Sequence, residues 1–323
     1  MTLDADMLAD RRRLKRRASL WRLLAIGVVT AAIVVTGPET AGDGKGWLGG
    51  DHIARYVVDG TITDDRKEQK LLDEIADSAR TKALIIHINS PGGTTAGAEA
   101  LFAALRRIGE KKPVVAVLGT VAASGGYAAA LAADHIVARG NTITGSIGVI
   151  MQWAEVGELL DKVGVRFDEV KSGPLKAEPS PFGRASPEVR AAMESMVRDS
   201  YEWFIGLVAD RRPISAERAR ELADGRIYSG RQAKDNNLVD AIGGEDIALA
   251  WLRSERKLGT GLKVLDWEKS SLSEFSLTGM TLGWLAQATG LEGVASMLRL
   301  SQKTLRAERL NLDGLVSLWH PEG

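Results

Sequence analysis

The stretch that decides the fold is ALIIHINSPGGTTAGAEALFAALRRI, residues 83–108. Its first six residues form a continuous apolar run, which is typical of a strand buried on both faces of a parallel sheet. A helix is predicted over 96–108, because Thr94 or Thr95 supplies a cap and Gly109 follows the last turn. The segment 89–93, with its two glycines, therefore reads as a turn from strand to helix.

The same alternation continues on both sides of this stretch. Further strands are predicted at 53–58, 114–119, 135–138 and 165–170, and further helices at 67–80 and 128–133. Strands that alternate with helices indicate an α/β fold with a mostly parallel sheet. Beyond residue 186 the pattern is helical. Ser186-Pro187-Glu188 is a strong helix start, that helix runs to about 210, and another begins near Ser215.

The amino-acid composition limits the number of domains and the kinds of site that the chain can have. The 323 residues allow one large domain or two small ones, and an apolar fraction of 45% is ample for a core. Basic and acidic residues balance at 42 each, so the chain has no bulk attraction for nucleic acid. The absence of cysteine excludes disulfides and thiolate nucleophiles, and the four histidines are too scattered for a helical metal pair. We therefore expect neither a catalytic metal nor a cofactor.

The N-terminus predicts a membrane anchor. Residues 11–17, RRRLKRR, precede the uncharged run LLAIGVVTAAIVVTG at 23–37. This run is shorter than the about 20 residues that cross a bilayer, but Leu20 and Trp21 extend it if Arg22 reaches the head groups. A cleaved signal peptide is the alternative, although the residues after the run offer no clean cleavage site.

The basic cluster should remain cytoplasmic by the positive-inside rule, which places the rest of the chain on the periplasmic or extracytoplasmic side of the inner membrane. The predicted organisation is a cytoplasmic basic segment (1–22), a transmembrane signal anchor (23–38), a linker (39–51), a catalytic domain (52–257) and a C-terminal extension of unreadable role (258–323).

Three segments carry groups that suit catalysis, and each also has an ordinary structural interpretation. The glycines of 90–93 let backbone N–H groups turn outward toward an oxyanion, or simply form a turn. Ser124, in AASGGY between a strand and a helix, is either a nucleophile or a helix cap. Lys176, at the end of KSGPLK (171–176), is either a desolvated base or a solvated surface lysine.

A serine nucleophile needs a base, and composition alone does not choose between histidine and lysine. His87 lies in an apolar strand and His135 on a short strand, where both are expected to pack as core residues. Neither has an acid at an evident orienting position in the sequence. The segment around Ser124 also lacks the Gly-x-Ser-x-Gly pattern of the α/β hydrolases.

Five motifs, taken in order, closely resemble the protease IV family of serine peptidases, which includes signal peptide peptidase A. The resemblance covers about residues 53–247, and the motifs are specific only in combination. They are Asn89-Ser90-Pro91-Gly92-Gly93, Ala123-Ser124-Gly125-Gly126-Tyr127, Thr144-Gly145-Ser146-Ile147-Gly148-Val149, Lys171-Ser172-Gly173 through Lys176, and Asp224-Gly225-Arg226-Ile227-Tyr228-Ser229-Gly230 with Gln232-Ala233.

The resemblance implies a Clp-protease/crotonase-like fold with repeated β-β-α units and a Ser–Lys dyad. Ser124 would be the nucleophile and Lys176 the base, with Ser146 orienting the lysine by a hydrogen bond. The chain departs from the family at Ala128, where many relatives have tyrosine, and at Ala177-Glu178 after the lysine. These departures affect the shape of the pocket more than the dyad.

The resemblance also implies an oxyanion hole built from the backbone N–H groups of Gly93 (or Gly92) and Gly125 (or Ser124). Expected substrates are signal peptides or other unfolded, apolar peptides. Tandem family members carry the two catalytic residues on different repeats. This single-length chain is therefore expected to form a homo-oligomeric ring with shared sites, without nucleic acid partners.

Two rival functions remain at the level of the sequence. An acyl-CoA enzyme of the crotonase type would use paired backbone N–H groups without needing Ser124 and Lys176 together, and an exported domain would lack a ready supply of CoA. A catalytically inactive scaffold would only bind peptides. A fluorophosphonate probe separates these alternatives, because only the peptidase should label through Ser124.

Overall fold

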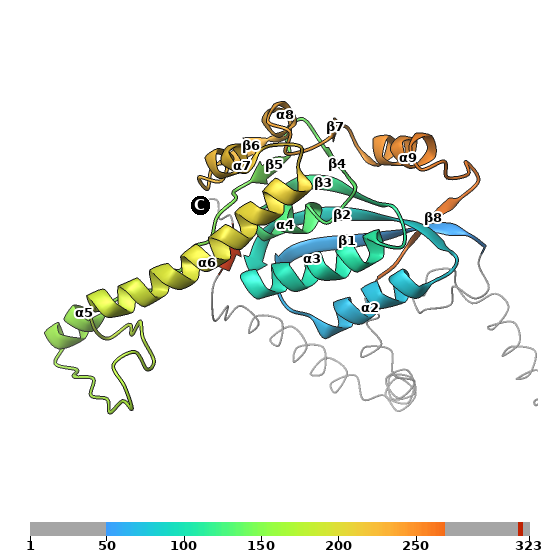
Figure 1. The fold of residues 1–323 in the computed structure, drawn as a ribbon. Coiled ribbons are helices and arrows are strands. Elements are labelled where there is room, and N and C mark those ends of the chain that lie inside the picture. Colours follow the sequence, from blue (N-terminus) through green and yellow to red (C-terminus); the bar gives the residue numbers. More distant parts are fainter. Residues whose placement is uncertain (1–49, 269–315, 319–323) are drawn as a thin grey trace, which may run out of the picture. The chain divides into compact units, whose positions relative to one another are not determined.

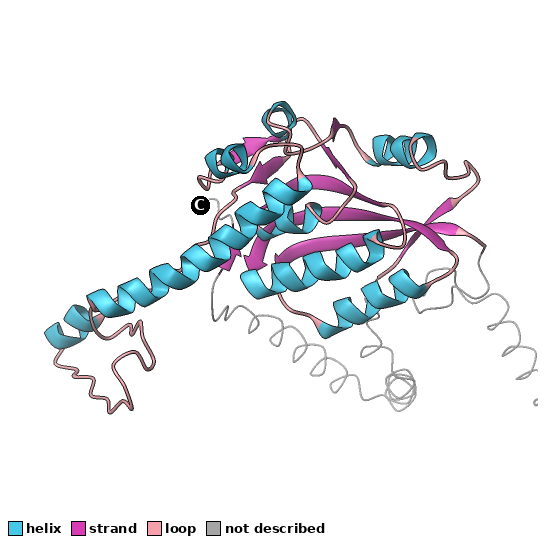
Figure 2. Cartoon of the chain, in the orientation of Figure 1, coloured by secondary structure: helices cyan, strands magenta, loops and turns pink. Residues whose placement is uncertain are grey.

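The computed structural model describes residues 50–268 and 316–318, in which strands and helices alternate from the first strand onward (Figures 1 and 2). The strands are β1 (His52–Ile62), β2 (Thr81–Thr94), β3 (Val114–Ala123), β4 (His135–Ala138), β5 (Ile143–Gly145), β6 (Ile227–Ser229), β7 (Ala241–Ile242), β8 (Lys263–Asp266) and β9 (Val316–Leu318). The helices are α2 (Arg66–Asp77), α3 (Thr95–Gly109), α4 (Gly125–Ala130), α5 (Gly157–Lys162), α6 (Pro187–Arg211), α7 (Ala216–Leu222), α8 (Gly230–Asp235) and α9 (Glu245–Ser254).

The strands form one mixed sheet whose central path runs β6-β5-β3-β2-β1-β8. The pairs β1–β2, β2–β3, β3–β5 and β1–β8 are parallel, whereas β5–β6 and β2–β9 are antiparallel. The predicted α/β class with a mostly parallel sheet is confirmed. The β-β-α order expected from the family occurs at β4-β5-α5, while β1 to β4 alternate singly with helices.

The two faces of the sheet are covered unequally. Alternate residues of β1, including Ala54, Tyr56 and Val58, pack with α2, α3 and α4 in the main hydrophobic core. The opposite face forms a smaller core in which Ile53 and Ile85 meet α9. This second core covers only the amino-terminal parts of the strands, since Val57, further along β1 on the same face, is exposed.

Two local predictions differ from the structure. The segment 165–170 is not a strand but an exposed, irregular segment, because no neighbouring strand within the described chain is available to pair with it. Residues 89–93 do not form a turn but continue β2 to Thr94, whose side chain caps α3 by accepting a hydrogen bond from Gly97. The expected helix start at Ser186 is confirmed, with its hydroxyl accepting from Val189.

Helix α6 extends beyond the sheet and carries a segment that we call the arm, residues 157–186 (Figure 1). Phe204, Ile205 and Val208, in the carboxyl-terminal half of α6, are buried in the main core. The amino-terminal half is mostly exposed, and its buried Val189 stands next to the arm. At 1.5 Å per residue, the helix between Val189 and Phe204 is roughly 22 Å long, so the arm lies well away from the core.

Two strands that follow residue 257 belong to the same sheet. β8 pairs in parallel with β1, and β9 pairs with the end of β2. Within residues 50–268 and 316–318, no helix has the length and apolar character needed to cross a membrane. The predicted anchor at 23–38 lies outside the described residues.

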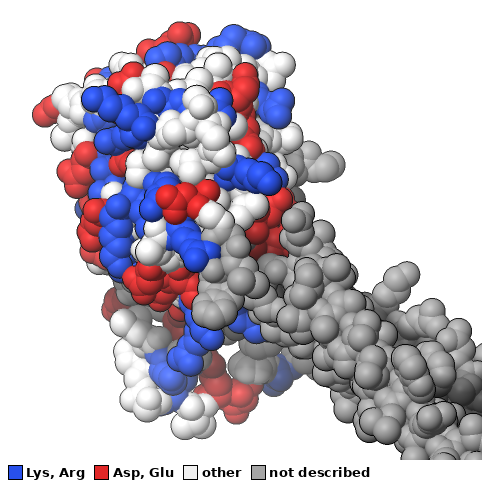
Figure 3. Space-filling model, turned by 90° about the vertical axis from the view of Figure 1, so that its right-hand side faces the viewer, with Lys and Arg blue, Asp and Glu red and all other residues white. Residues whose placement is uncertain are grey.

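Charged side chains of both signs are interspersed on the face that Figure 3 displays. This distribution agrees with the balance of 42 basic and 42 acidic residues in the whole chain. A face that binds nucleic acid would carry basic side chains gathered in a patch or stripe. Among the described residues on this face, the basic side chains form no such patch.

Candidate active site

The carboxyl ends of three adjacent strands bring together most of the residues singled out by the motifs. Gly92 and Gly93 lie near the end of β2, β3 leads into Ser124 and β5 leads into Ser146. β3 lies between the other two strands and pairs in parallel with both. Open α/β sheets bind ligands beyond the carboxyl ends of their strands. The carboxyl ends of β2, β3 and β5 are therefore the candidate active site.

Ser124 occupies a sharp turn between β3 and α4. Its backbone has φ 55° and ψ −122°, a region that residues with side chains rarely adopt. The residue is 1% exposed, and its backbone N–H donates to the carbonyl oxygen of Gly145 at 2.8 Å. A serine held on a strained strand-to-helix turn is the arrangement of nucleophiles in α/β hydrolases, although the surrounding sequence lacks their pattern.

Ser146 lies beside Ser124. The register of β3 and β5 pairs Ala122 with Thr144 and Ala123 with Gly145. The residue that directly follows each of these strands is a serine, Ser124 after β3 and Ser146 after β5. Neighbouring strands are about 4.8 Å apart, which makes the two backbones direct neighbours. Ser146 also has a positive φ, 49°, and its N–H donates to the carbonyl of Arg226 at 2.8 Å.

The glycines of the two Gly-Gly pairs let backbone segments approach closely. A Cβ on Gly93 would lie 1.8 Å from the carbonyl oxygen of Ile62, and a Cβ on Gly126 would lie 2.7 Å from that of Ser90. Neither position admits a side chain without movement of the backbone. The motifs thus require glycine because β1, β2 and the start of α4 converge at the site.

Hydrogen bonds narrow the choice of oxyanion donors. The N–H of Gly92 donates to Ser90 Oγ at 3.1 Å, and that of Ser124 is engaged by Gly145. A Cβ built on Gly125 would lie 3.3 Å from the Gly93 nitrogen, so these two residues are close neighbours. The N–H groups of Gly93 and Gly125 are therefore the better candidates of each predicted pair.

Lys176 is not part of this cluster. It lies on the arm, its side chain is exposed, and its backbone N–H donates to the carbonyl of Gly173 at 3.1 Å. No ion pair of Lys176 occurs among the residues that the structure describes. Within one chain the structure therefore groups Ser124, Ser146 and the glycines, and places Lys176 elsewhere.

The other lysine of the same segment, Lys171, is held in ion pairs. Its Nζ lies 2.6 Å from Glu169 Oε1 and 2.5 Å from Glu178 Oε1. The hydrogen bonds that Lys171 donates to Glu169 and Glu178 raise its pKa above the usual value. Ion pairing favours the protonated form of Lys171, whereas a base must be partly neutral, so Lys171 is a poorer candidate for that role than Lys176.

The histidines do have acidic partners, contrary to the expectation from sequence. His87 Nε2 lies 2.7 Å from Glu245 Oε2, and His135 Nδ1 lies 3.9 Å from Asp240 Oδ2. Sequence reasoning missed these partners because they lie far away along the chain. Both histidines are nevertheless remote from Ser124: His87 is opposite Val117, and the strand from there to Ser124 covers roughly 20 Å.

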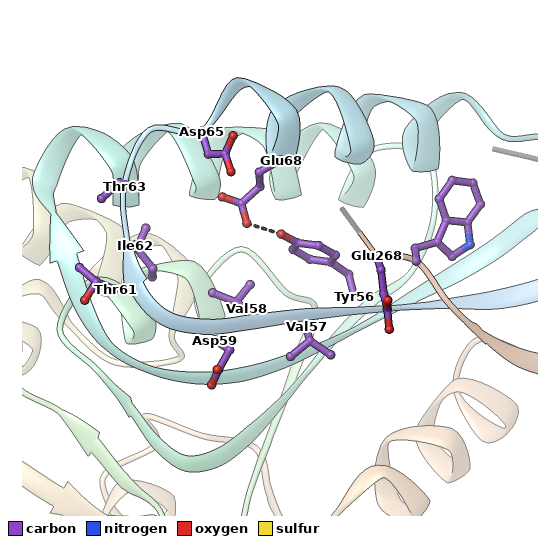
Figure 4. Close-up of a pocket in the computed structure, with 11 residues that line it drawn as sticks. Tyr56, Val57, Val58, Asp59, Thr61, Ile62, Thr63, Asp65, Glu68 and Glu268 are labelled. Carbon is purple, nitrogen blue, oxygen red and sulfur yellow. Dashed lines mark hydrogen bonds between the residues drawn. The ribbon is translucent and has the colours of Figure 1, made fainter. Parts of the chain in front are cut away.

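A hollow of about 440 Å³ lies along the second half of β1, between that strand, the start of α2 and Trp267 (Figure 4). In it the hydroxyl of Tyr56 points toward Glu68 and donates a hydrogen bond to Oε1. Burial raises the pKa of Tyr56, which keeps this hydroxyl protonated. The hollow reaches Thr61 and Ile62, which pair with Gly92 and Gly93, but its lining includes neither Ser124 nor Ser146, so it is not the candidate active site.

Comparisons with known proteins find relatives of this chain among peptidases. The model of peptidase family S49 matches residues 106–259, which include Ser124, Ser146 and Lys176. A putative protease of Synechocystis is 39% identical over 200 residues, covering 62% of this chain and 72% of the relative. A putative signal peptide peptidase SppA of Enterococcus faecium is 35% identical over 230 residues, covering 70% of this chain and 65% of the relative.

Two further matches are limited in other ways, one by the share of the relative that is covered and one by low sequence identity. Protease 4 of Salmonella typhi is 35% identical over 240 residues, covering 73% of this chain but 35% of the relative. Among solved structures, a ClpP1 mutant of Listeria monocytogenes aligns with a TM-score of 0.40 and 21% identity, covering 59% of this chain and 91% of that one.

Proposed function

Because the chain belongs to peptidase family S49 and is a serine peptidase, we propose that it is a membrane-anchored endopeptidase whose Ser–Lys site is completed between neighbouring protomers. Ser124 of one protomer is the nucleophile and Lys176 of the next is the base. The observation that carries this proposal is the separation of the two side chains within one chain. Membership in a peptidase family also disfavours the acyl-CoA alternative.

The proposed reaction uses the groups gathered at the strand ends. Lys176 Nζ accepts the proton of the Ser124 hydroxyl as Oγ attacks the scissile carbonyl carbon. The N–H groups of Gly93 and Gly125 bind the developing oxyanion. The lysine then protonates the leaving amine, and an acyl-enzyme on Ser124 remains. Water, deprotonated by the same lysine, releases the acid product, while Ser146 holds the ammonium in place.

The surface of the arm supports an intermolecular site. Seven of the thirteen large apolar side chains that stand exposed in the described residues lie on the arm, although it makes up a small part of the chain. Exposed apolar patches of this kind mark interaction surfaces. The seven exposed apolar side chains on the arm are Leu159, Val163, Val165, Phe167, Val170, Leu175 and Phe182. A neighbouring protomer that covers this surface would also desolvate Lys176.

A ring is the assembly that such contacts favour. Contact of one protomer's arm with the strand ends of the next is head-to-tail, and head-to-tail contacts form rings when the rotation closes. Unfolded apolar peptides, signal peptides included, are the substrates that fit an extended backbone site. The signal anchor predicted at 23–38 holds the ring at the inner membrane, with the catalytic domain on the extracytoplasmic side.

Mixing two inactive variants tests the shared site. Ser124→Ala protomers keep an intact Lys176, and Lys176→Ala protomers keep an intact Ser124, so each variant alone should be inactive. In rings assembled at random from equal amounts, about a quarter of the sites should pair an intact serine with an intact lysine. Peptidase activity near that fraction of the wild-type value is the expected result.

Lys171→Ala is the matched control, because it removes a lysine from the same arm but leaves Lys176 in place. It should retain most of the activity without mixing. If co-assembled rings of the two inactive variants stay inactive, with assembly verified by mass spectrometry, the site is contained within one chain and the proposal is wrong.

A further inference from the structure

Ser90 is a buried polar residue of the candidate active site to which the proposed reaction gives no part. It lies on β2 opposite Ala122, which stands two residues before Ser124, and its side chain is 0% exposed. Its hydroxyl accepts the N–H of Gly92 at 3.1 Å and donates a longer bond, 3.4 Å, to the Gly92 carbonyl oxygen. One side chain therefore holds both hydrogen-bonding groups of Gly92.

The strand β2 is irregular at this point. Asn89 is opposite Asp59 of β1, whereas Gly92, three residues further along β2, is opposite Thr61, only two residues further along β1. The extra residue makes a bulge, in which Gly92 takes a φ of 110° that favours glycine. A bulge interrupts the ladder and turns backbone groups in a new direction. The Ser90 hydroxyl supplies the partner for the Gly92 N–H inside this bulge.

The contact with the Gly92 carbonyl sets the direction of the next N–H group. The carbonyl of Gly92 and the N–H of Gly93 belong to the same peptide group, which is planar and trans, so the two point in opposite directions. A side chain that fixes this carbonyl therefore also aims the Gly93 N–H, one of the two proposed oxyanion donors. The second donor is adjacent, since a Cβ built on Gly125 would lie 3.3 Å from the Gly93 nitrogen.

We propose that Ser90 is a positioning residue whose hydroxyl fixes the peptide group between Gly92 and Gly93, so that the Gly93 N–H faces the oxyanion before a substrate arrives. This inference rests on the proposed function, since it assumes that an oxyanion forms when Ser124 attacks. Donors that are already oriented stabilise a transition state because they need no rearrangement during the reaction. Ser90 acts through Gly93, so its loss should lower kcat and leave KM nearly unchanged.

Ser90→Ala tests the role of the hydroxyl. It leaves the buried N–H of Gly92 without this acceptor and frees the peptide group to turn. For an extended apolar reporter peptide we expect kcat to fall by about tenfold or more, with KM within about twofold of the wild type. Ser90→Thr keeps a hydroxyl and should retain most of the wild-type kcat. Rates are divided by the concentration of sites that a fluorophosphonate labels at completion, so unfolded protein does not contribute.

Thr81→Val is the matched control, because it removes another buried hydroxyl from the same strand. Thr81 Oγ1 donates to Ser78 Oγ at 3.0 Å and lies 3.2 Å from His52 Nε2. The strand from Thr81 to Ser90 covers roughly 30 Å, so this variant should lower the melting temperature without changing kcat. A loss of kcat in Thr81→Val as large as that in Ser90→Ala would overturn the proposal, and so would an equal loss in Ser90→Thr.

Inhibition by a peptide aldehyde separates this inference from the peptidase function. The aldehyde forms a hemiacetal with Ser124 whose oxygen takes the place of the oxyanion, so it reports on the donors directly. Its inhibition constant should rise in Ser90→Ala by about the factor by which kcat falls. If the wild type is active and Ser90→Ala keeps its kcat or its inhibition constant, the positioning role alone is wrong. A wild type that neither hydrolyses the reporter nor reacts at Ser124 would refute the proposed function, and this inference with it.

Discussion

Ser124 and Ser146 both hold backbone conformations that cost about 1–3 kcal/mol each for residues with side chains. Such strain persists only where the surrounding structure enforces it. Here the carbonyls of Gly145 and Arg226 accept the N–H groups of the two serines at 2.8 Å. Two strained serines on neighbouring strand ends are difficult to explain as helix caps, and Ser124 makes no side-chain capping bond to α4.

At the residue scale, Gly125→Ala should reduce catalysis more than stability. The new Cβ would lie 3.3 Å from Gly92 Cα and from the Gly93 nitrogen, tighter than ordinary contact, so the proposed oxyanion donors must shift. Because a misplaced oxyanion donor is costly, we expect kcat to fall by about 10- to 100-fold. The loss of folding free energy should be about 1–2 kcal/mol. Steady-state kinetics and thermal melts measure the two effects.

Gly206→Ala is the control for this variant. It lies on α6, where a Cβ meets nothing within 4 Å. It should leave kcat unchanged and raise stability by about 0.5–1 kcal/mol through helix propensity. A Gly125→Ala enzyme with the kcat of the wild type would show that this glycine does not position the oxyanion site.

At the scale of elements, α6 acts as a support for the arm. Its carboxyl-terminal half is fixed in the core, and its other half holds the arm away from the sheet. Within the arm, Phe167 and Phe182 stack with ring centroids 4.0 Å apart, and Lys171 pairs with two glutamates. The arm therefore has stabilising side-chain contacts of its own.

Val170→Asp should weaken the assembly of protomers without changing the folding of each protomer. Val170 is fully exposed, so a carboxylate there leaves the folding of one protomer unchanged. If a second protomer covers the arm, the buried charge weakens the contact. We expect smaller assemblies by analytical ultracentrifugation and a loss of peptidase activity of about tenfold or more. Ile242→Asp, on an exposed apolar residue away from the arm, should change neither property. Normal assembly of Val170→Asp would contradict the proposed interface.

At the scale of the whole molecule, the proposed anchor predicts where activity is found. The full chain should remain with membranes at high salt, and deletion of residues 1–38 should release an active enzyme into the soluble fraction. A reporter that is active only outside the cytoplasm, fused after residue 50, should be active. Activity of a cytoplasm-only reporter at the same position would reverse the proposed orientation.

The sequence alone determined the features that depend on short stretches of chain. Continuous apolar runs predicted β1 to β4, and Ser186-Pro187 predicted the start of α6, because burial and capping act within a few residues. The candidate site residues were assigned differently, by the resemblance of the five motifs to a known family, because the local sequence left Ser124 open as a helix cap and Lys176 open as a surface lysine.

The tertiary structure decided what depends on residues far apart in the chain. It placed acids beside His87 and His135, left 165–170 without a partner strand, and joined β8 and β9 to the sheet. It also set Ser146 next to Ser124 and held Lys176 away from both on the arm. Strand pairing and side-chain contact form through space, and the spacing of residues along a chain carries little information about which distant segments will meet.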